Sequence, residues 1–122
     1  MKSFLAFVLM ACLHAQGWAN QQLDEGQQRV TQEIEAWNSC IRHELKQQIQ
    51  SIASPAFIAE TTLDLCNANY LRLQQLMMDD MQKRGGSASA VQVEKMVIDS
   101  LKDAKDNHRA KIISIVLKYR AK

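Results

Sequence analysis

The sequence predicts an all-α protein in which a cleaved export signal is followed by a three-helix up-down-up bundle. Three observations support this prediction. The 122 residues include one proline and four glycines, and Gln, Ala, Leu and Lys are frequent, which is typical of helical chains. Apolar residues recur at intervals of three and four along three segments of similar length. Finally, Cys40 and Cys66 lie at equal distances from the break between the first two segments.

The N-terminal segment has the organisation of a secretory signal. Lys2 is followed by the predominantly apolar residues 4–13 and then by small residues. Cleavage after Ala19 fits best, and cleavage after Gly17 is the near alternative. The apolar run is too short to cross a bilayer, because that needs about 20 residues in a helix. We therefore expect a signal peptide over residues 1–19 and a single helical domain over 20–122, located in the periplasm or secreted.

Cys12 allows a second interpretation of this segment. Leu9-Met10-Ala11-Cys12 resembles the lipobox of bacterial lipoproteins, in which the cysteine becomes the lipidated first residue. However, Met10 is uncommon at the second position of that motif, and the signal would be short. The sequence favours Cys12 as a small apolar residue of the signal peptide, with a lipid-anchored protein as the alternative.

The first predicted helix covers residues about 23–51. Its polar side carries Gln, Glu, Arg and Lys, as expected of a helix with one face in water. Its apolar residues follow helical spacing and are Val30, Ile34, Trp37, Ile41, Leu45, Ile49 and Ile52.

The second predicted helix covers residues 55–84. Ser54 and Pro55 fit an N-cap followed by proline at the first helical position, where its missing N–H is not needed. Gly85 is suited to a left-handed C-cap. The apolar residues of this helix are Ile58, Leu65, Tyr70, Leu73, Leu76 and Met77.

The third predicted helix covers residues 89–119. Ser89 and Gln92 fit a capping box at its start. The β-branched segment 111–119 also fits a strand, but a strand there would have no partner, so the helix is preferred. The apolar stripe consists of Val93, Val97, Leu101, Ala104, Ile112, Ile115 and Tyr119.

An even number of cysteines in the exported chain predicts a disulfide between Cys40 and Cys66. Cys66 lies near the centre of its helix's apolar stripe, whereas Cys40 lies toward the flank of its own. The alternative is a zinc site formed by Cys40, His43 and Cys66, with Asn69 as a poor fourth ligand. A Cys-x-x-Cys redox pair is absent from the sequence.

The sequence contains no arrangement that predicts catalysis, a metal or a cofactor. His43-Glu44 begins a H-E-x-x-H motif but lacks its second histidine, because position 47 is glutamine. His108 is a lone histidine on an apolar stripe. Three carboxylates that form a row along one side of the third helix are interleaved with lysine and arginine residues, which is typical of a solvated, ion-paired face. They are Asp99, Asp103 and Asp106.

Two groups of apolar residues suggest a partner surface. One consists of Ile113, Val116 and Leu117, which fall outside the main stripe of the third helix. The other is the methionine cluster near the end of the second helix: Met77, Met78 and Met81. Methionines at this spacing usually fill a core, but they also suit adaptable binding surfaces.

These features predict a small, non-enzymatic protein of the bacterial cell envelope that acts by binding another envelope protein or a second copy of itself. It could be an inhibitor or immunity protein, a chaperone-like factor or an accessory component. A nucleic-acid partner is not expected, since the charges are interspersed rather than gathered into a basic stripe. No transmembrane span is expected in the mature chain. The alternatives are a lipoprotein anchored through Cys12 and a small all-α enzyme with a site between helices.

Overall fold

The structure, a computed structural model, describes residues 25–86 and 88–122. These residues form four helices and no strand, which confirms the predicted all-α class. The predicted signal peptide, its two cleavage sites and Cys12 lie outside the described residues. The helices are α2 (Glu25–Gln48), α3 (Pro55–Leu65), α4 (Asn67–Lys83) and α5 (Ala90–Arg120).

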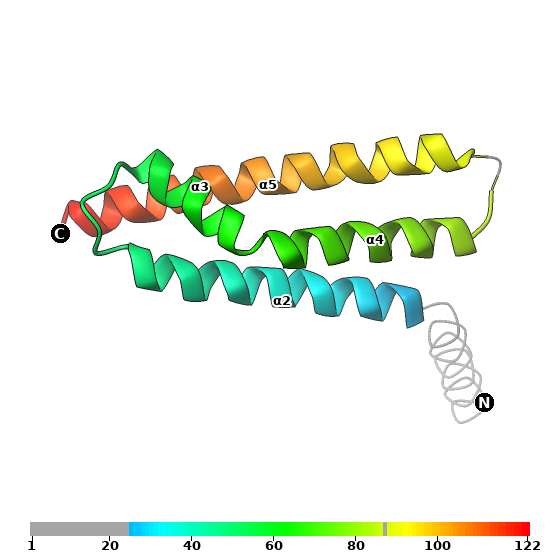
Figure 1. Ribbon diagram of the computed structural model, residues 1–122, viewed down its shortest axis with the longest axis horizontal. Helices are drawn as coiled ribbons and strands as arrows, with labels where there is room; N and C mark the ends of the chain where they lie inside the picture. Colours follow the sequence, from blue (N-terminus) through cyan, green and yellow to red (C-terminus); the bar gives the residue numbers. More distant parts are fainter. Residues whose placement is uncertain (1–24, 87) are drawn as a thin grey trace, which may run out of the picture.

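The helices make three passes along one long axis, and α5 runs in the same direction as α2 (Figure 1). The prediction of one continuous helix over 55–84 is wrong, because the returning pass is divided at Cys66 into α3 and α4. The Cys66 backbone leaves the helical region (φ −100°, ψ 14°), and its N–H is shared between the Thr62 and Leu63 carbonyl oxygens. Cysteine and the following Asn67 are both weak helix formers, which favours a break here.

The break at Cys66 changes the neighbours of the returning pass. On one side of it, α3 packs mainly against α5, and on the other side α4 packs mainly against α2. A straight helix would keep the same neighbours along its whole length. The bend therefore leaves α2 and α5 unequally covered at the two ends of the molecule.

The predicted helix caps are confirmed. The Ser54 Oγ accepts a hydrogen bond from the Phe57 N–H at 3.2 Å, and Pro55 follows as the first residue of α3. Ser89 and Gln92 form both hydrogen bonds of the capping box, at 3.2 and 2.9 Å. Gly85 adopts a φ of +70°, the left-handed conformation that favours glycine. The sequence therefore specified the start of α3, the start of α5 and the turn before it.

The core lies where the inward faces of the helices meet. Its buried apolar side chains are Trp37, Ile41, Leu45, Ile58, Ala59, Leu63, Cys66, Leu73, Val93, Val97, Leu101, Ile112 and Val116. Four residues of the predicted stripes are instead exposed: Ile34, Leu65, Ile115 and Tyr119. Ile52 is also fully exposed, because α2 ends at Gln48 and Ile52 lies in the following turn.

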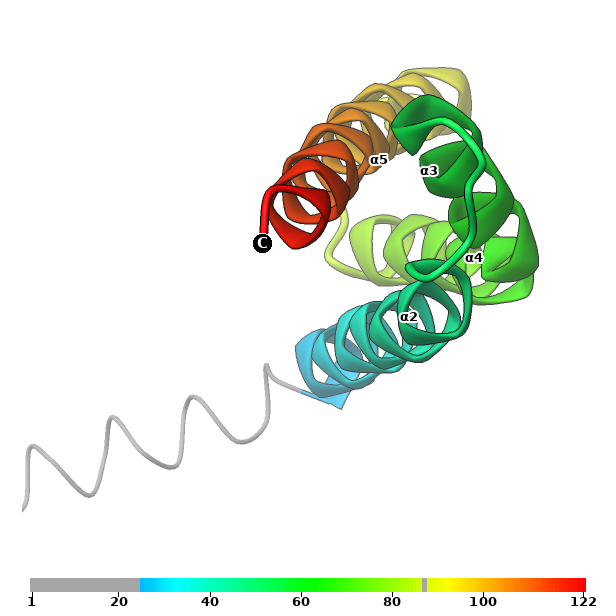
Figure 2. The same ribbon diagram turned by 90° about the vertical axis from the view of Figure 1, so that its left-hand side faces the viewer.

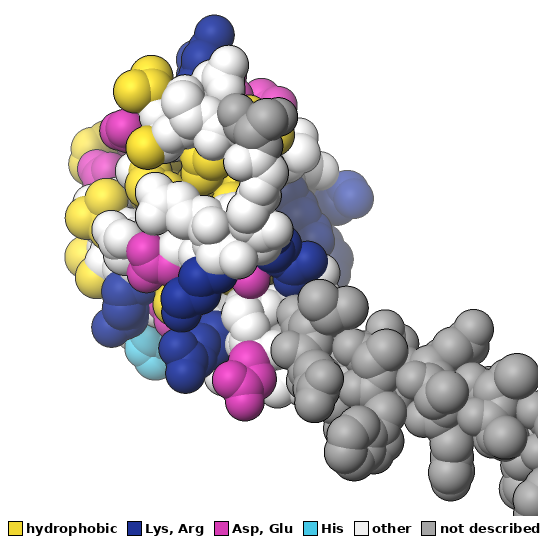
Figure 3. Space-filling view, turned by 90° about the vertical axis from the view of Figure 1, so that its right-hand side faces the viewer, with side chains coloured by type: hydrophobic (Ala, Val, Ile, Leu, Met, Phe, Trp, Pro, Cys, Tyr) yellow, Lys and Arg dark blue, Asp and Glu magenta, His cyan; other side chains and the backbone are white. Residues whose placement is uncertain are grey.

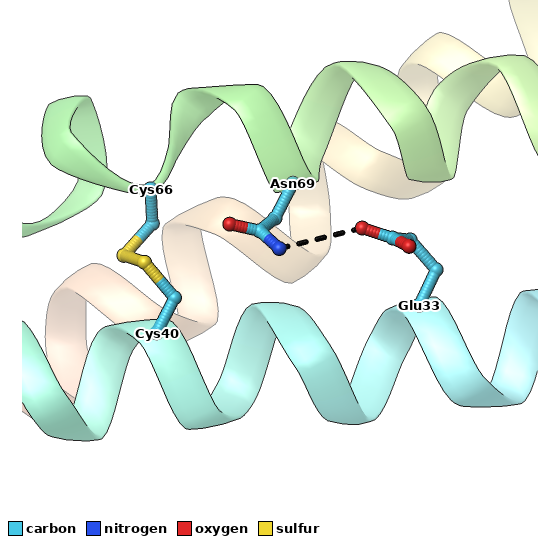
Figure 4. The surroundings of a disulfide bond; sticks show 4 residues. All are labelled: Glu33, Cys40, Cys66 and Asn69. Carbon is cyan, nitrogen blue, oxygen red and sulfur yellow. Dashed lines mark hydrogen bonds between the residues drawn. A yellow bond between two sulfur atoms is a disulfide. The ribbon is translucent and has the colours of Figure 1, made fainter.

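A disulfide joins Cys40 of α2 to Cys66, with the two Cα atoms 5.8 Å apart (Figure 4). The predicted pairing is confirmed, and the flanking position of Cys40 is compatible with it. Two turns away, the Glu33 carboxylate accepts hydrogen bonds from Asn69 Nδ2 at 3.4 Å and from the Arg72 Nε at 3.3 Å. The disulfide and these polar contacts both hold α2 against the returning pass.

We predict that a Cys40→Ser/Cys66→Ser variant loses about 3 kcal/mol of unfolding free energy, because the disulfide closes a loop of 26 residues in the unfolded chain. Urea denaturation followed by circular dichroism measures this loss. Wild-type protein in excess reductant is the control and should match the variant. A loss below about 1 kcal/mol would show that helix packing alone fixes α2 against the bend.

Candidate functional site

The open side of the molecule lies between α2 and α5. These helices form the two sides of an angle whose apex is occupied by α3 and α4 (Figure 2). Each packs against the α3–α4 pass, but they make almost no backbone contact with each other. A hollow of about 270 Å³ lies between them. We call it the α2–α5 groove.

The α2–α5 groove has two walls, each contributed by one helix. The α2 wall consists of Asn38, Ile41, Arg42 and Leu45. The α5 wall consists of His108, Lys111, Ile112 and Ile115. Another hollow, of about 300 Å³, has as its described lining five polar residues of the first turns of α2. Because these residues belong to one exposed helix, we do not consider it a site.

The floor of the groove is apolar and its rim is cationic. Ile41, Leu45 and Ile112 are buried, and Ile115 remains 37% exposed. Arg42 and Lys111 are exposed at the edges of the two walls. No described carboxylate lies within ion-pair distance of either cation. The groove therefore offers apolar surface flanked by two cations that lack an anionic partner in the described part of the chain.

Trp37 joins three helices beside the groove. Its ring meets Tyr70 of α4 edge-on, with centroids 5.4 Å apart, and His108 of α5 edge-on at 4.6 Å. The Lys105 ammonium of α5 lies 5.1 Å from the centroid of the Tyr70 ring. Edge-to-face aromatic pairs contribute about 0.5–1.5 kcal/mol each beyond their burial. This cluster connects α2 to α5 through side chains where their backbones separate.

Two buried polar atoms near the groove lack a hydrogen-bond partner among the described residues. They are the indole Nε1 of Trp37 and the Oδ1 of Asn38. Asn38 is also part of the α2 wall. Because both atoms are almost inaccessible from outside, a molecule bound in the groove would not reach them, and they do not mark a ligand contact.

The pKa of His108 is lowered from its usual value. The main cause is burial, which disfavours the charged imidazolium, and the positive charge of Lys111 adds to the effect. His108 therefore contributes a neutral ring to the groove at neutral pH. The ring also packs against Trp37, which identifies this predicted lone histidine as a boundary residue of the core.

The zinc alternative is contradicted by the disulfide, which occupies both sulfur atoms and leaves no thiolate to bind a metal. Asn69 instead donates to Glu33. Among the described residues, no three His, Cys, Asp or Glu side chains come together as a metal site. On the outer face of α5, Asp106 pairs with Arg109, which also pairs with Glu60 of α3. That part of the predicted carboxylate row is thus an ion-paired surface.

The structure separates the two predicted partner surfaces. The methionine cluster lies toward the C-terminal end of α4, and residues 113–117 lie toward the C-terminal end of α5, at opposite ends of the molecule (Figure 1). Met77, Met78, Met81 and Ile113 are half-buried and pack against the core. Val116 is completely buried, so its prediction as a surface residue is wrong. It lies on the side of α5 that faces α3. Leu117 is exposed, with 54% of its surface accessible.

The end of the molecule at which α4 ends and α5 begins also exposes apolar side chains. In Figure 3 they gather along one edge and within a hollow between the helix ends, with basic and acidic side chains interspersed around them. The exposed apolar residues in the first turns of α5 are Val91, Met96 and Ile98. Because charges of both signs surround it, this surface shows no preference for a partner of one charge.

The sequence analysis identified His108 as a polar residue on the third stripe, but it did not identify Asn38 and Arg42 on the facing wall. The sequence contains only part of the information needed to predict the two walls of the groove. Apolar spacing predicts which face of a helix is buried, but not which two faces remain apart. Arg42 adjoins the predicted stripe and would be assigned to the solvated side of a closed bundle.

Comparisons with protein-family models, curated proteins and solved structures found no match to this chain. Across residues 25–86 and 88–122, no helix combines the length and apolar character needed to span a membrane. The function is therefore argued from the groove itself.

We predict that lowering the pH from 7.5 to 5 destabilises the protein partly through His108. Because the folded-state pKa lies below the usual 6.5, the unfolded chain binds more protons once the pH falls below 6.5. The unfolding free energy therefore falls over this interval, down to the folded-state pKa. A His108→Gln variant should lose less stability than the wild type between the two pH values, measured by urea denaturation. His43→Gln, which removes an exposed imidazole, is the matched control. An equal loss in wild type and His108→Gln would contradict the assignment.

Proposed function

We propose that this protein is a small, non-enzymatic component of the bacterial cell envelope that binds another protein in the α2–α5 groove. The observation that supports this proposal most is an apolar groove in which Ile115 is exposed, bordered by two cations that have no ion-pair partner among the described residues. Such a groove, bordered by two parallel helices, is a common place for a protein segment to bind. The groove would serve to bind the partner protein in each of the three proposed roles: an inhibitor or immunity protein, a chaperone-like factor or an accessory component.

Export and a role in the envelope are supported by the sequence and by the disulfide. Residues 1–19 have the organisation of a cleaved signal, and a structural disulfide is typical of oxidising compartments such as the periplasm. In this proposal the mature domain begins at residue 20 and forms the bundle of three passes, with the returning pass bent. A lipoprotein anchored through Cys12 is the alternative.

The enzyme alternative has less support. Catalysis would require polar groups converging on one place, with at least one able to move a proton. In the groove, Arg42 and Lys111 stand at the rim on opposite walls, and the neutral His108 packs against Trp37. None of the described contacts pairs His108 with a nucleophile or a carboxylate. The arrangement suits recognition better than catalysis.

We predict that the mature protein purified from the envelope begins at Asn20. Its intact mass should match residues 20–122 less two daltons, because the disulfide removes two hydrogens. Reduction should restore the two daltons, which serves as the internal control. A mass corresponding to a chain that begins at a diacylglyceryl-modified Cys12 would contradict cleavage and establish the lipoprotein.

We predict that Ile115→Glu abolishes capture of the partner protein from envelope extract, since it places a carboxylate on the groove's apolar wall. Loss of one buried apolar contact and the cost of the charge should weaken binding at least tenfold. Leu117→Glu is the matched control, because Leu117 is also an exposed apolar residue of the last turns of α5. Both variants are compared by quantitative affinity capture.

Leu117→Glu should retain the same partner as the wild type. Loss of capture with Leu117→Glu but not with Ile115→Glu would transfer the binding surface to the C-terminal apolar group. Equal capture by wild type and both variants would contradict binding in the groove.

A further inference from the structure

We infer that the occupant of the α2–α5 groove is an amphipathic helix of another protein, with acidic residues flanking its apolar stripe on both sides. This inference rests on the proposed function and specifies the partner's chemistry. It follows from the shape of the groove and the placement of its charges.

The shape favours a helix. The two walls are themselves helices that run in the same direction and separate from a common apex (Figure 2). A helix laid between them would pack its ridges into the grooves of both, as helices do within bundles. An extended segment would bring backbone N–H and C=O groups onto the apolar floor, and no described strand edge is present to pair with them. A helix satisfies those groups internally.

The charges favour acidic flanks. Arg42 stands at the outer edge of the α2 wall, and Lys111 stands at the outer edge of the α5 wall. Neither has an ion-pair partner among the described residues. A helix whose apolar stripe covers Ile115 and lies between the two walls would present one flank to each cation. Carboxylates on both flanks, at i+3 or i+4 spacing along the partner, complement the two walls together.

A second copy of this chain fits the groove poorly. It would have to offer an exposed apolar stripe with acidic residues on both sides. The exposed apolar residues of the first turns of α5 are interleaved with Glu94, Lys95, Asp99 and Lys102, so a cation would meet a cation in the groove. The first turns of α5 therefore do not provide the complementary pattern. On α3, the exposed Phe57 and Leu65 accompany acidic residues. However, Glu60 already pairs with Arg109 of its own chain, so a different protein is the better occupant.

The test uses a phage-displayed library of amphipathic helices with a fixed apolar stripe and variable flanking residues. The purified disulfide-bonded protein is the bait. We expect selected helices to be enriched in Glu and Asp on both flanks. A selected helix, synthesised as a peptide, should bind with an affinity that falls as salt is raised.

Charge reversal makes the test specific. Arg42→Glu/Lys111→Glu should weaken the selected acidic peptide about tenfold or more, from the loss of two charge pairs and the repulsion that replaces them. The same variant should bind a version of the peptide with lysine flanks better than the wild type does. Lys95→Glu/Lys102→Glu is the matched control, because it makes the same change in net charge on another side of α5. It should leave the affinity within about twofold.

The possible outcomes separate this inference from the proposed function. Selected helices that need Ile115 but have neutral or basic flanks would overturn the acidic partner and leave the groove as a binding site. Failure to select any helix, or selection of helices unaffected by Ile115→Glu, would overturn both. A dimer of the purified protein that Ile115→Glu dissociates, or binding to phosphatidylglycerol vesicles that depends on Arg42 and Lys111, would also overturn the inference.

Discussion

The covalent connection between Cys40 and Cys66 is the constraint around which the rest of the structure is arranged. It ties the middle of α2 to the residue at which the returning pass changes direction. From this point α4 follows α2, while α3 follows α5. If the returning pass were straight, α2, α5 and that pass could close around a common axis. With the bend, the C-terminal half of α2 loses cover on one side, and the groove opens there.

The aromatic cluster connects α2 to α5 across this opening. Trp37 lies three residues before Cys40 on α2, and it contacts both the returning pass and α5 through its ring. It therefore spans the angle between the outer helices where no backbone contact closes it. Nearby, Arg120 of α5 donates hydrogen bonds to the carbonyl oxygens of Ser51 and Ala53, which ties the last turn of α5 to the loop before α3. The two walls of the groove are thus held at both the aromatic cluster and the far end of α5.

Much of the fold could be predicted because it depends on local sequence. The caps at Ser54, Ser89 and Gly85 follow from residue types that satisfy backbone groups or permit a left-handed φ. The disulfide followed from symmetry around the break and the number of cysteines. The bend at Cys66 was missed because a weak helix propensity over a few residues rarely decides a structure, and here packing on two different neighbours adds to it. The signal peptide remains a prediction from sequence.

The groove could not be predicted for a different reason. Its residues belong to two helices that are far apart in sequence, and its existence depends on the angle between them. A helical stripe shows that Ile115 faces inward on average, but whether it is covered depends on the position of α2. The burial of Val116 is the converse case, in which a residue outside the predicted stripe is covered by a neighbouring helix. It falls outside the main stripe of α5, yet it is buried because α3, displaced by the bend, covers that side of the helix.

The organisation of the groove has a consequence for binding that the overall composition conceals. The full chain carries a formal net charge of only +2, so long-range attraction contributes little to choosing a partner. Selectivity for the proposed partner would therefore depend on the positions of individual charges. Arg42 and Lys111 stand on two walls whose separation is fixed by a disulfide, an aromatic cluster and the contacts of Arg120. Because the walls are already in place, a partner does not have to supply the free energy to order them, and more of the contact energy is available for affinity. In the proposed binding, a covalent bond remote from the rim would therefore help the cations to distinguish one partner from another.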